Sequence, residues 1–288
     1  MLDFTVVVMK GAIVIMLDAL GDRMKNYENI NRVYLTRRMP CILRLDGRAF
    51  HTYTKKFNKP FDYVFMEAMW DTAKQLCQNI SGAKMAYVQS DEISILLTDY
   101  DTLETEPWFG KNLQKMCSVA ASMASIFFYK AHDNAIEDYI VTCEENDYII
   151  PDWIDAHNNA QESKLAVFDC RAFVLPMSEV NNYFLWRQKD CERNAVSMVA
   201  RTLFSDKELE GKSTEERKKM MVDQHSLDWE FILPFYRKGV CVRKYDCTET
   251  CRILGEEPFK VQRKRWEIAK HIPSFQEHPE YINELVNI

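Results

Sequence analysis

The stretch Arg44-Leu45-Asp46-Gly47-Arg48-Ala49-Phe50-His51 decides the predicted fold and site. The apolar run Cys41-Ile42-Leu43 leads into it and predicts a buried strand, residues 41–45, that ends at the Asp46 carboxylate. Glycine permits close backbone approach of a ligand, and an arginine fork matches phosphate oxygens. The stretch therefore suits a metal and a phosphate. By itself, however, Asp-Gly predicts an ordinary turn equally well, so the site requires a partner carboxylate.

Apolar periodicity predicts three further strands and two helices after this stretch. In chain order they are a helix over residues 62–80, strands over 85–89 and 93–98, a helix over 111–131 and a strand over 166–175. The order βαββαβ predicts an α+β fold with the ferredoxin-like arrangement. In that arrangement the first and second strands are parallel and flank the third. The order therefore predicts that Asp46 lies beside Asp91, although 45 residues separate them.

Two aspartates at the ends of neighbouring strands are suited to magnesium, which prefers oxygen ligands and accepts phosphates and water. Two such ions roughly 3.5–4 Å apart assist phosphoryl displacement. The hydroxyl of Ser90 and the cations Lys59 and Arg48 are available to a triphosphate. The competing interpretation is that both aspartates only form turns. Convergence of these groups at one end of one sheet favours a nucleotide site.

Composition indicates a globular protein: 47% of the 288 residues are hydrophobic. The formal net charge of −6 does not indicate nucleic-acid binding, but charge is distributed unevenly. Residues 99–169 contain 14 acidic and four basic side chains, whereas residues 237–271 contain ten basic and five acidic ones. A basic C-terminal surface is suited to a polyanion, and a solvated face of mixed charge is equally consistent with the counts.

Nine scattered cysteines predict buried thiols in a reducing compartment, and we expect a cytoplasmic protein. Cys241, Cys247 and Cys251 lack the Cys-x-x-Cys spacing typical of zinc sites. The apolar segment 4–17 is too short for a membrane span and lacks signal-peptide features, so we expect no membrane association. Beyond Pro176 the pattern predicts a helix over 181–202, a solvated or mobile insertion over 206–221, and a strand over 240–244 paired with 259–262.

The chain resembles the tRNA-histidine guanylyltransferase superfamily in six motifs. They are Leu45-Asp46-Gly47-Arg48-Ala49-Phe50-His51, Lys59-Pro60, Gln89-Ser90-Asp91-Glu92, Phe168-Asp169-Cys170-Arg171, Trp186-Arg187-Gln188-Lys189-Asp190 and Tyr236-Arg237-Lys238-Gly239. The resemblance implies a polymerase-type palm with a helical and small β C-terminal extension. We expect an N-terminal extension over residues 1–19, a palm catalytic domain over 20–178 and an RNA-contacting region over 179–288.

The resemblance implies a magnesium-dependent nucleotidyltransferase that adds nucleotides to the 5′ end of tRNA in the 3′–5′ direction, using ATP and GTP or other nucleoside triphosphates. It also implies two magnesium ions and a homotetramer. By position, catalysis falls to Asp46, Asp91 and Glu92, and magnesium ligation to Asp46, the Gly47 carbonyl and Asp91. The expected nucleotide contacts are Asp46, Gly47, Arg48, Ala49, Phe50, His51, Lys59, Ser90 and Asp91. The expected RNA or phosphate contacts are Arg187, Lys189, Arg193, Arg237 and Lys238.

One departure separates branches of the superfamily. Members that add a guanylate to tRNA-histidine carry His-x-Asn-Asn where this chain has Glu192-Arg193-Asn194-Ala195. The chain is therefore more similar to the guanylyltransferase-like branch, which repairs 5′-truncated tRNA by templated addition. Untemplated guanylate addition is the alternative within the superfamily. A nucleotidyl cyclase and a non-catalytic RNA-binding protein are alternatives of other classes.

Overall fold

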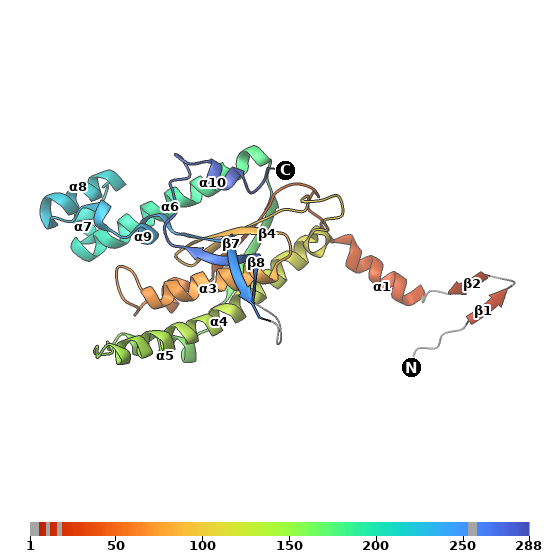
Figure 1. The fold of residues 1–288 in the computed structure, drawn as a ribbon, viewed down its shortest axis with the longest axis horizontal. Helices are drawn as coiled ribbons and strands as arrows, with labels where there is room; N and C mark the ends of the chain where they lie inside the picture. Colours follow the sequence, from red (N-terminus) through yellow and green to blue (C-terminus); the bar gives the residue numbers. More distant parts are fainter. Residues whose placement is uncertain (1–5, 10–11, 16–18, 253–257, 288) are drawn as a thin grey trace.

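The centre of the protein is a six-stranded antiparallel sheet (Figure 1). The computed structural model describes residues 6–9, 12–15, 19–252 and 258–287. Across the sheet the strand order is β6-β3-β5-β4-β7-β8. The strands are β3 (Cys41–Gly47), β4 (Ala83–Gln89), β5 (Glu92–Leu97), β6 (Phe168–Val174), β7 (Val240–Cys251) and β8 (Phe259–Ala269). Mixed α and β elements around this sheet confirm the α+β class.

Strand β5 lies between β3 and β4 and is antiparallel to both, as the order of the elements predicted. The first predicted strand, 41–45, continues through Gly47 because both of its edges are paired, with β5 on one side and β6 on the other. Asp46 and Gly47 are consequently part of the sheet. Their positions are set by backbone ladders on two sides.

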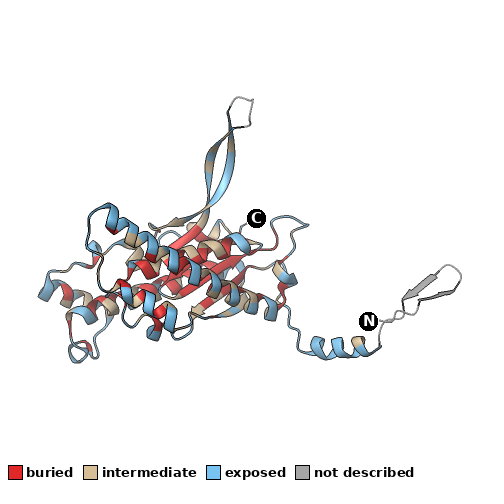
Figure 2. Cartoon of the chain, turned by 90° about the horizontal axis from the view of Figure 1, so that it is seen from below, coloured by how far each residue is buried: buried red, intermediate tan, exposed pale blue. Residues whose placement is uncertain are grey.

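Helices cover both faces of the sheet. Residues of β3 alternate between two cores, with Leu43 and Leu45 in one and Ile42 in the other. The first core lies under α3 (Tyr63–Asn79) and α4 (Leu113–Glu145), and the second lies under α6 (Met177–Leu203) and α10 (Glu280–Asn283). Figure 2 shows the buried residues concentrated between these layers.

The predicted helices begin at polar caps. Asp62 accepts a 2.8 Å hydrogen bond from the Phe65 main-chain N–H, which confirms it as the N-cap of α3. Asn112 caps α4 in the same way. α4 continues beyond the predicted end at residue 131 and is followed by α5 (Ile154–Ser163), which the sequence did not predict. The extension carries a buried residue, His132, to which α5 contributes a partner.

The charged segment 206–221 was predicted to be a mobile or solvated insertion. Most of its side chains are exposed, as expected of a solvated segment, but the sequence did not predict that it is helical and packed on α6. It forms α7 (Asp206–Leu209) and the beginning of α8 (Thr214–His225), and each helix starts with a Ser/Glu capping box. Leu209 and Met221 are buried against the C-terminal part of α6. Two buried apolar side chains are enough to hold a short polar segment against α6. Because there are so few of them, the sequence of the segment shows little apolar periodicity.

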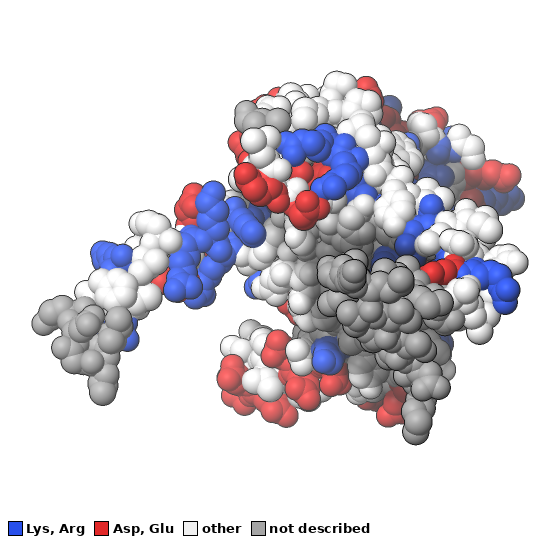
Figure 3. All heavy atoms as spheres, turned by 90° about the vertical axis from the view of Figure 1, so that its right-hand side faces the viewer, with Lys and Arg blue, Asp and Glu red and all other residues white. Residues whose placement is uncertain are grey.

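The C-terminal strands belong to the central sheet, because β7 pairs with β4 and β8 pairs with β7. The two predicted strands do pair with each other, but the predicted register was wrong, because residues 241–244 pair with 266–269 and residues 259–262 pair with 248–251. The distal part of this strand pair projects from the body as an arm (Figure 2). Exposed basic side chains lie along the arm (Figure 3): Lys244, Arg252, Lys260, Arg263, Lys264 and Arg265. The region predicted over residues 179–288 therefore contributes strands to the same sheet as the palm domain predicted over residues 20–178.

Short elements complete the described chain. They are β1 (Val6–Met9), β2 (Ala12–Ile15), α1 (Ala19–Ile30), α2 (Phe50–Tyr53), the 3₁₀ turns η1 (Trp108–Lys111) and η2 (Trp229–Phe231), and α9 (Pro234–Lys238). β1 and β2 pair antiparallel in a sheet of their own within the predicted N-terminal extension. Among the described residues, no helix has the length and hydropathy required to cross a membrane.

Candidate nucleotide-binding site

Asp46 and Asp91 meet where β3 ends and β5 begins. Asp46 pairs in register with Glu92, the first residue of β5. The Gly47 main-chain N–H donates a 3.0 Å hydrogen bond to the Asp91 carbonyl oxygen. The predicted neighbourhood of the two aspartates is therefore confirmed, and main-chain contacts hold it.

The electrostatics of this pair favour a bound cation. Burial raises the pKa of Asp91, and the nearby charge of Asp46 raises it further, although hydrogen bonds from the Asp91 amide and Ser90 act in the opposite direction. A divalent cation between the carboxylates would offset this cost. The two carboxylates are thus better suited to binding a cation than to lying side by side without one.

The donor set fits magnesium. Among the residues that the structure describes, no group of three His, Cys, Asp or Glu side chains is placed to hold a metal ion. Magnesium commonly takes only one or two carboxylates and completes its octahedron with water and substrate phosphates. Asp46, Asp91 and the Gly47 carbonyl are hard oxygen donors of this kind. They suit an ion that arrives with a nucleotide better than one enclosed by protein side chains.

Two residues of the expected nucleotide loops adopt left-handed backbone conformations. Ala49 has φ 56° and Ser90 has φ 47°. Such conformations cost non-glycine residues about 1 kcal/mol or more and concentrate at functional sites. Ser90 forms the tight β4–β5 turn with Asp91, and its side chain is exposed. The strained positions therefore flank the Asp46–Asp91 pair on both sides.

The Asp46–His51 segment divides into exposed and buried positions. Arg48, Ala49 and His51 are exposed, which leaves them accessible to a ligand. Phe50 is 2% exposed and packs in the core under the sheet. The expected nucleotide contact of Phe50 is accordingly limited to its main chain, because its side chain is buried in the core.

Lys59 lies on the exposed loop before α3. Its ammonium group is 3.4 Å from the Thr54 carbonyl oxygen, and its main-chain N–H donates to the Asn58 side chain at 2.9 Å. These contacts leave the ammonium group accessible at the surface. Lys59 and Arg48 are thus both accessible to a ligand, and their binding of phosphate oxygens stays a prediction.

Glu92 is the centre of a buried ion-pair network. It is 5% exposed and accepts two hydrogen bonds of 2.7 Å from Arg187, together with a 3.0 Å bond from Arg44. Arg187 also donates to Asp190 at 2.8 Å. The expected RNA contact of Arg187 has no support in this structure, because its guanidinium is buried and bonded to Glu92 and Asp190. In this structure Glu92 supports the Asp46–Asp91 site indirectly, because its ion pairs stabilise the strand that begins next to Asp91.

The remaining expected RNA contacts differ in exposure. Lys189 and Arg193 are exposed on α6, with Arg193 paired to Asp190. Arg237 is partly buried and pairs with Glu230 at 2.6 Å. The Lys238 carbonyl oxygen accepts a 2.8 Å hydrogen bond from Tyr87. Lys189 and Arg193 are consequently the most accessible of the five predicted contacts.

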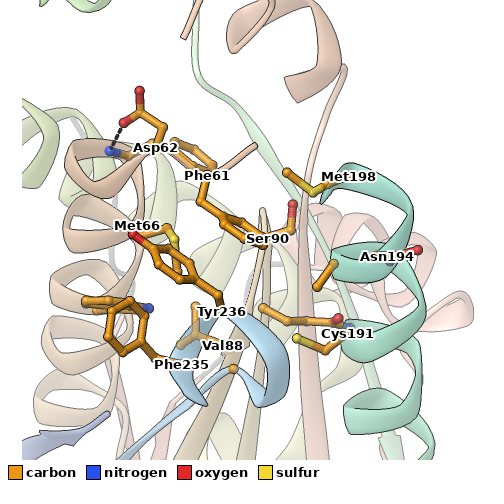
Figure 4. A pocket seen from close by; sticks show the side chains of 15 residues that line it. Phe61, Asp62, Met66, Val88, Ser90, Cys191, Asn194, Met198, Phe235 and Tyr236 are labelled. Carbon is orange, nitrogen blue, oxygen red and sulfur yellow. Dashed lines mark hydrogen bonds between the residues drawn. The ribbon is translucent and has the colours of Figure 1, made fainter. Parts of the chain in front are cut away.

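A cavity of about 80 Å³ lies beside Ser90. Its walls come from α3, β4, α6 and α9, and the rings of Phe61 and Tyr236 stack at 4.2 Å across its edge (Figure 4). Asn194 also lines it. Sequence reasoning did not name these three lining residues as site residues. Phe61 follows the Lys59-Pro60 motif, Tyr236 belongs to a matched motif, and Asn194 lies in the segment that departs from the guanylate-adding pattern.

These features coincide with an established family. A model of the tRNA-His guanylyltransferase family, Thg1, matches residues 21–176. The chain belongs to this family, and it is a nucleotidyltransferase by class. In particular, it is similar to a bacterial Thg1-like protein solved in complex with ATP, with 38% identity and a TM-score of 0.75. That similarity covers 94% of this chain and 100% of the other. The same kind of protein in complex with GTP matches with a TM-score of 0.70.

More distant relatives carry the guanylyltransferase name. The tRNA(His) guanylyltransferase of Debaryomyces hansenii is 26% identical, over 82% of this chain and 84% of that protein. A probable tRNA(His) guanylyltransferase from Homo sapiens is 25% identical, over 84% of this chain and 82% of that protein. Since each alignment covers more than four fifths of this chain, both extend beyond residue 176.

Proposed function

We propose that this protein is a magnesium-dependent nucleotidyltransferase that extends the 5′ end of truncated tRNA in the 3′–5′ direction. The observation that carries the proposal is the Asp46–Asp91 pair, held side by side by the bond from Gly47 and bearing a raised Asp91 pKa. The Thg1-like proteins solved with ATP and with GTP support nucleoside triphosphates as substrates. We assign the βαββαβ segment, with order β6-β3-β5-β4, to a ferredoxin-like palm.

The reaction has two stages. A 5′-monophosphate attacks the α-phosphorus of ATP, pyrophosphate leaves, and the RNA end becomes adenylylated. The 3′-hydroxyl of an incoming nucleoside triphosphate then attacks the RNA 5′ phosphorus, and AMP leaves. Where the RNA already carries a 5′-triphosphate, pyrophosphate is the leaving group. The added nucleotide brings its own triphosphate to the new 5′ end.

Each assigned residue has a limited task. Arg48 and Lys59 bind and orient the triphosphate as exposed cations. Asp46, the Gly47 carbonyl and Asp91 would hold magnesium, which when bound neutralises charge on phosphate oxygens and lowers the pKa of an attacking hydroxyl. Ser90 presents a hydroxyl beside them. Because Gly47 and the Ser90–Asp91 turn are fixed by the backbone, the substrate is positioned without a large rearrangement.

Templated repair is the branch that we propose. Glu192 stands where guanylate-adding members carry histidine, and it accepts a 2.6 Å hydrogen bond from Lys218. It is thus part of the surface that joins α6 to α8. The 38% identity to a Thg1-like protein, against 26% to the Debaryomyces hansenii enzyme, supports the same branch.

The test offers 5′-truncated and full-length tRNAs with all four nucleoside triphosphates and magnesium. The expected product carries nucleotides that complement the opposite strand, and chelation of magnesium abolishes its formation. Asp46→Asn and Asp91→Asn should each reduce incorporation by at least about 10³-fold, whereas Asp133→Asn, an exposed control on α4, should not. Addition of guanylate alone, whatever lies opposite, would reject templated repair. Cyclic nucleotide formed without RNA would reject the polymerase reaction.

A further inference from the structure

Four buried polar side chains form a continuous hydrogen-bond chain outside the Asp46–Asp91 pair. The Tyr53 hydroxyl is 3.0 Å from His132 Nδ1, His132 Nε2 is 2.8 Å from His157 Nδ1, and His157 Nε2 is 3.0 Å from Asp62 Oδ2. Both histidines are fully buried, and Tyr53 and Asp62 are 4% and 6% exposed. Burial of four such groups is costly unless every one is bonded.

Asp62 fixes the direction of the bond at its end of the chain. Its carboxylate also accepts main-chain N–H bonds from Phe65 at 2.8 Å and Asn58 at 2.9 Å. Burial favours the protonated acid, but the hydrogen bond from His157 and the two amides outweigh burial and lower the Asp62 pKa. Asp62 is therefore an ionised acceptor, and His157 donates to it from Nε2. The role of His157 Nδ1 depends on the charge of the ring, because a neutral ring accepts there and a protonated ring donates.

The orientation of the next two groups depends on the charge of His157. When His157 is neutral, its Nδ1 accepts from His132 Nε2, and His132 Nδ1 accepts from the Tyr53 hydroxyl. When His157 is protonated, its Nδ1 donates to His132 Nε2, and His132 Nδ1 donates to the Tyr53 oxygen. Burial, together with the proximity of His157, lowers the pKa of His132 to about 3, which keeps this ring neutral. Either arrangement bonds all four groups, so the chain is a continuous structural link.

The link closes the base of the loop that carries Lys59. Tyr53 ends α2, directly after the Asp46–His51 segment, and Asp62 caps α3. His132 on α4 and His157 on α5 connect Tyr53 to Asp62 by hydrogen bonds. These bonds therefore join the two ends of the loop over residues 54–61. Inside the loop, the Phe57 ring stacks on His157 with centroids 3.9 Å apart.

Two further hydrogen bonds connect Asp62, at the end of this four-residue chain, to Lys59. The Asn58 N–H donates to Asp62, and the Asn58 side chain accepts from the Lys59 N–H at 2.9 Å. On the other side, the Phe50 ring lies 5.4 Å from Tyr53 and fills the space beside Gly47. The four-residue chain thus connects the backbone around Lys59 with the backbone around Gly47.

We propose that His132 and His157 are positioning residues of the nucleotide site: by linking Tyr53 to Asp62 they hold Lys59 in register with the Asp46–His51 segment for triphosphate binding. This inference rests on the proposed function, because it assumes that Lys59 meets the triphosphate. The expected benefit is preorganisation, since a loop that is already ordered loses less entropy when the ligand binds.

The test compares His157→Gln, His157→Leu and Tyr53→Phe with an exposed control, His271→Gln. Leucine removes both hydrogen bonds of the ring, whereas the glutamine amide offers one donor and one acceptor. We expect His157→Leu to raise KM for the nucleoside triphosphate about tenfold while kcat of the folded enzyme changes less than about twofold. His157→Gln should recover most of this loss. Tyr53→Phe, which deletes one hydroxyl, should raise KM about threefold.

Two measurements without RNA separate this proposal from the proposed function. Equilibrium titration of the full-length protein with magnesium–ATP reports nucleotide binding, and amide hydrogen exchange at Asn58 and Lys59 reports order in the loop. Faster exchange together with weaker binding in His157→Leu supports the proposal. Unchanged exchange and binding in both His157→Leu and Tyr53→Phe would overturn it. If His157→Leu does not fold, Tyr53→Phe decides alone. A wild type that fails to bind nucleotide would instead reject the proposed function.

Discussion

The main-chain N–H of Gly47 donates a 3.0 Å hydrogen bond to the main-chain carbonyl of Asp91. This bond joins the end of β3 to the β4–β5 turn, so the backbone holds the two aspartate positions together. Side-chain substitutions at Asp46 or Asp91 should therefore remove chemistry and leave the local fold intact. A loss of activity in such variants would therefore report the loss of the carboxylate and not a change in the fold.

Gly47→Ala should destabilise the protein by about 1–3 kcal/mol, because overpacking a filled core forces its neighbours to shift. A Cβ at this position would lie 2.5 Å from the Phe50 ring, which is itself buried. Urea unfolding of Gly47→Ala, Phe50→Leu and the double variant measures the effect. We expect the double variant to lose less stability than the sum of the single ones, since leucine relieves the clash. Strict additivity would contradict this account.

Glu92→Ala should lower the free energy of unfolding by about 3–5 kcal/mol, because it leaves the buried Arg187 guanidinium without its main partner. Glu106→Ala is the matched control. Glu106 pairs with Arg37 at 2.7 Å, but its side chain is 77% exposed, and such pairs contribute about 0–1 kcal/mol. Chemical denaturation compares the two variants. Equal losses would show that burial of the Glu92 network does not matter.

Asp62→Asn should destabilise the protein at neutral pH and make its stability less sensitive to acid. The Asp62 pKa is lowered in the folded state from an ordinary value of 3.8. The carboxylate therefore stabilises the fold above that ordinary value, and the contribution disappears as the pH falls through the folded-state pKa. Unfolding free energies of wild type and variant at pH 7 and pH 3 test this. A gap that widened toward pH 3 would contradict the assignment of charge.

Met221→Ala should cost about 2–5 kcal/mol, as expected for a methionine removed from a core. Met221 is fully buried where α8 packs on α6, whereas its neighbour Val222 is 46% exposed. Val222→Ala is accordingly the control and should change stability by less than about 0.5 kcal/mol. Thermal unfolding of both variants distinguishes a docked α8 from the solvated insertion that the sequence predicted. Equal behaviour of the two variants would favour the insertion.

Local pattern was sufficient for much of the sheet and for the proximity of Asp46 to Asp91. Strands with buried faces have short apolar runs, and the order βαββαβ allows few arrangements. The same reasoning missed α5 and the two docked helices of residues 206–221. In both places the segment is mostly polar and is held by a few contacts from distant elements, such as His157 with His132 and Met221 with α6. Those contacts leave little periodicity in the sequence.

The sequence by itself determined the order of the elements, the Asp46–His51 stretch with its partner turn, and the motifs that indicate the family. Only the tertiary structure decided which side chains are accessible. Arg187 and Glu92 form a buried ion pair, and Phe50 fills the core beside Gly47. His132 on α4 and His157 on α5 join the two ends of the loop that carries Lys59. The physical reason is that burial and hydrogen-bond partnership depend on residues far apart in the chain, whereas a motif records only neighbours in sequence.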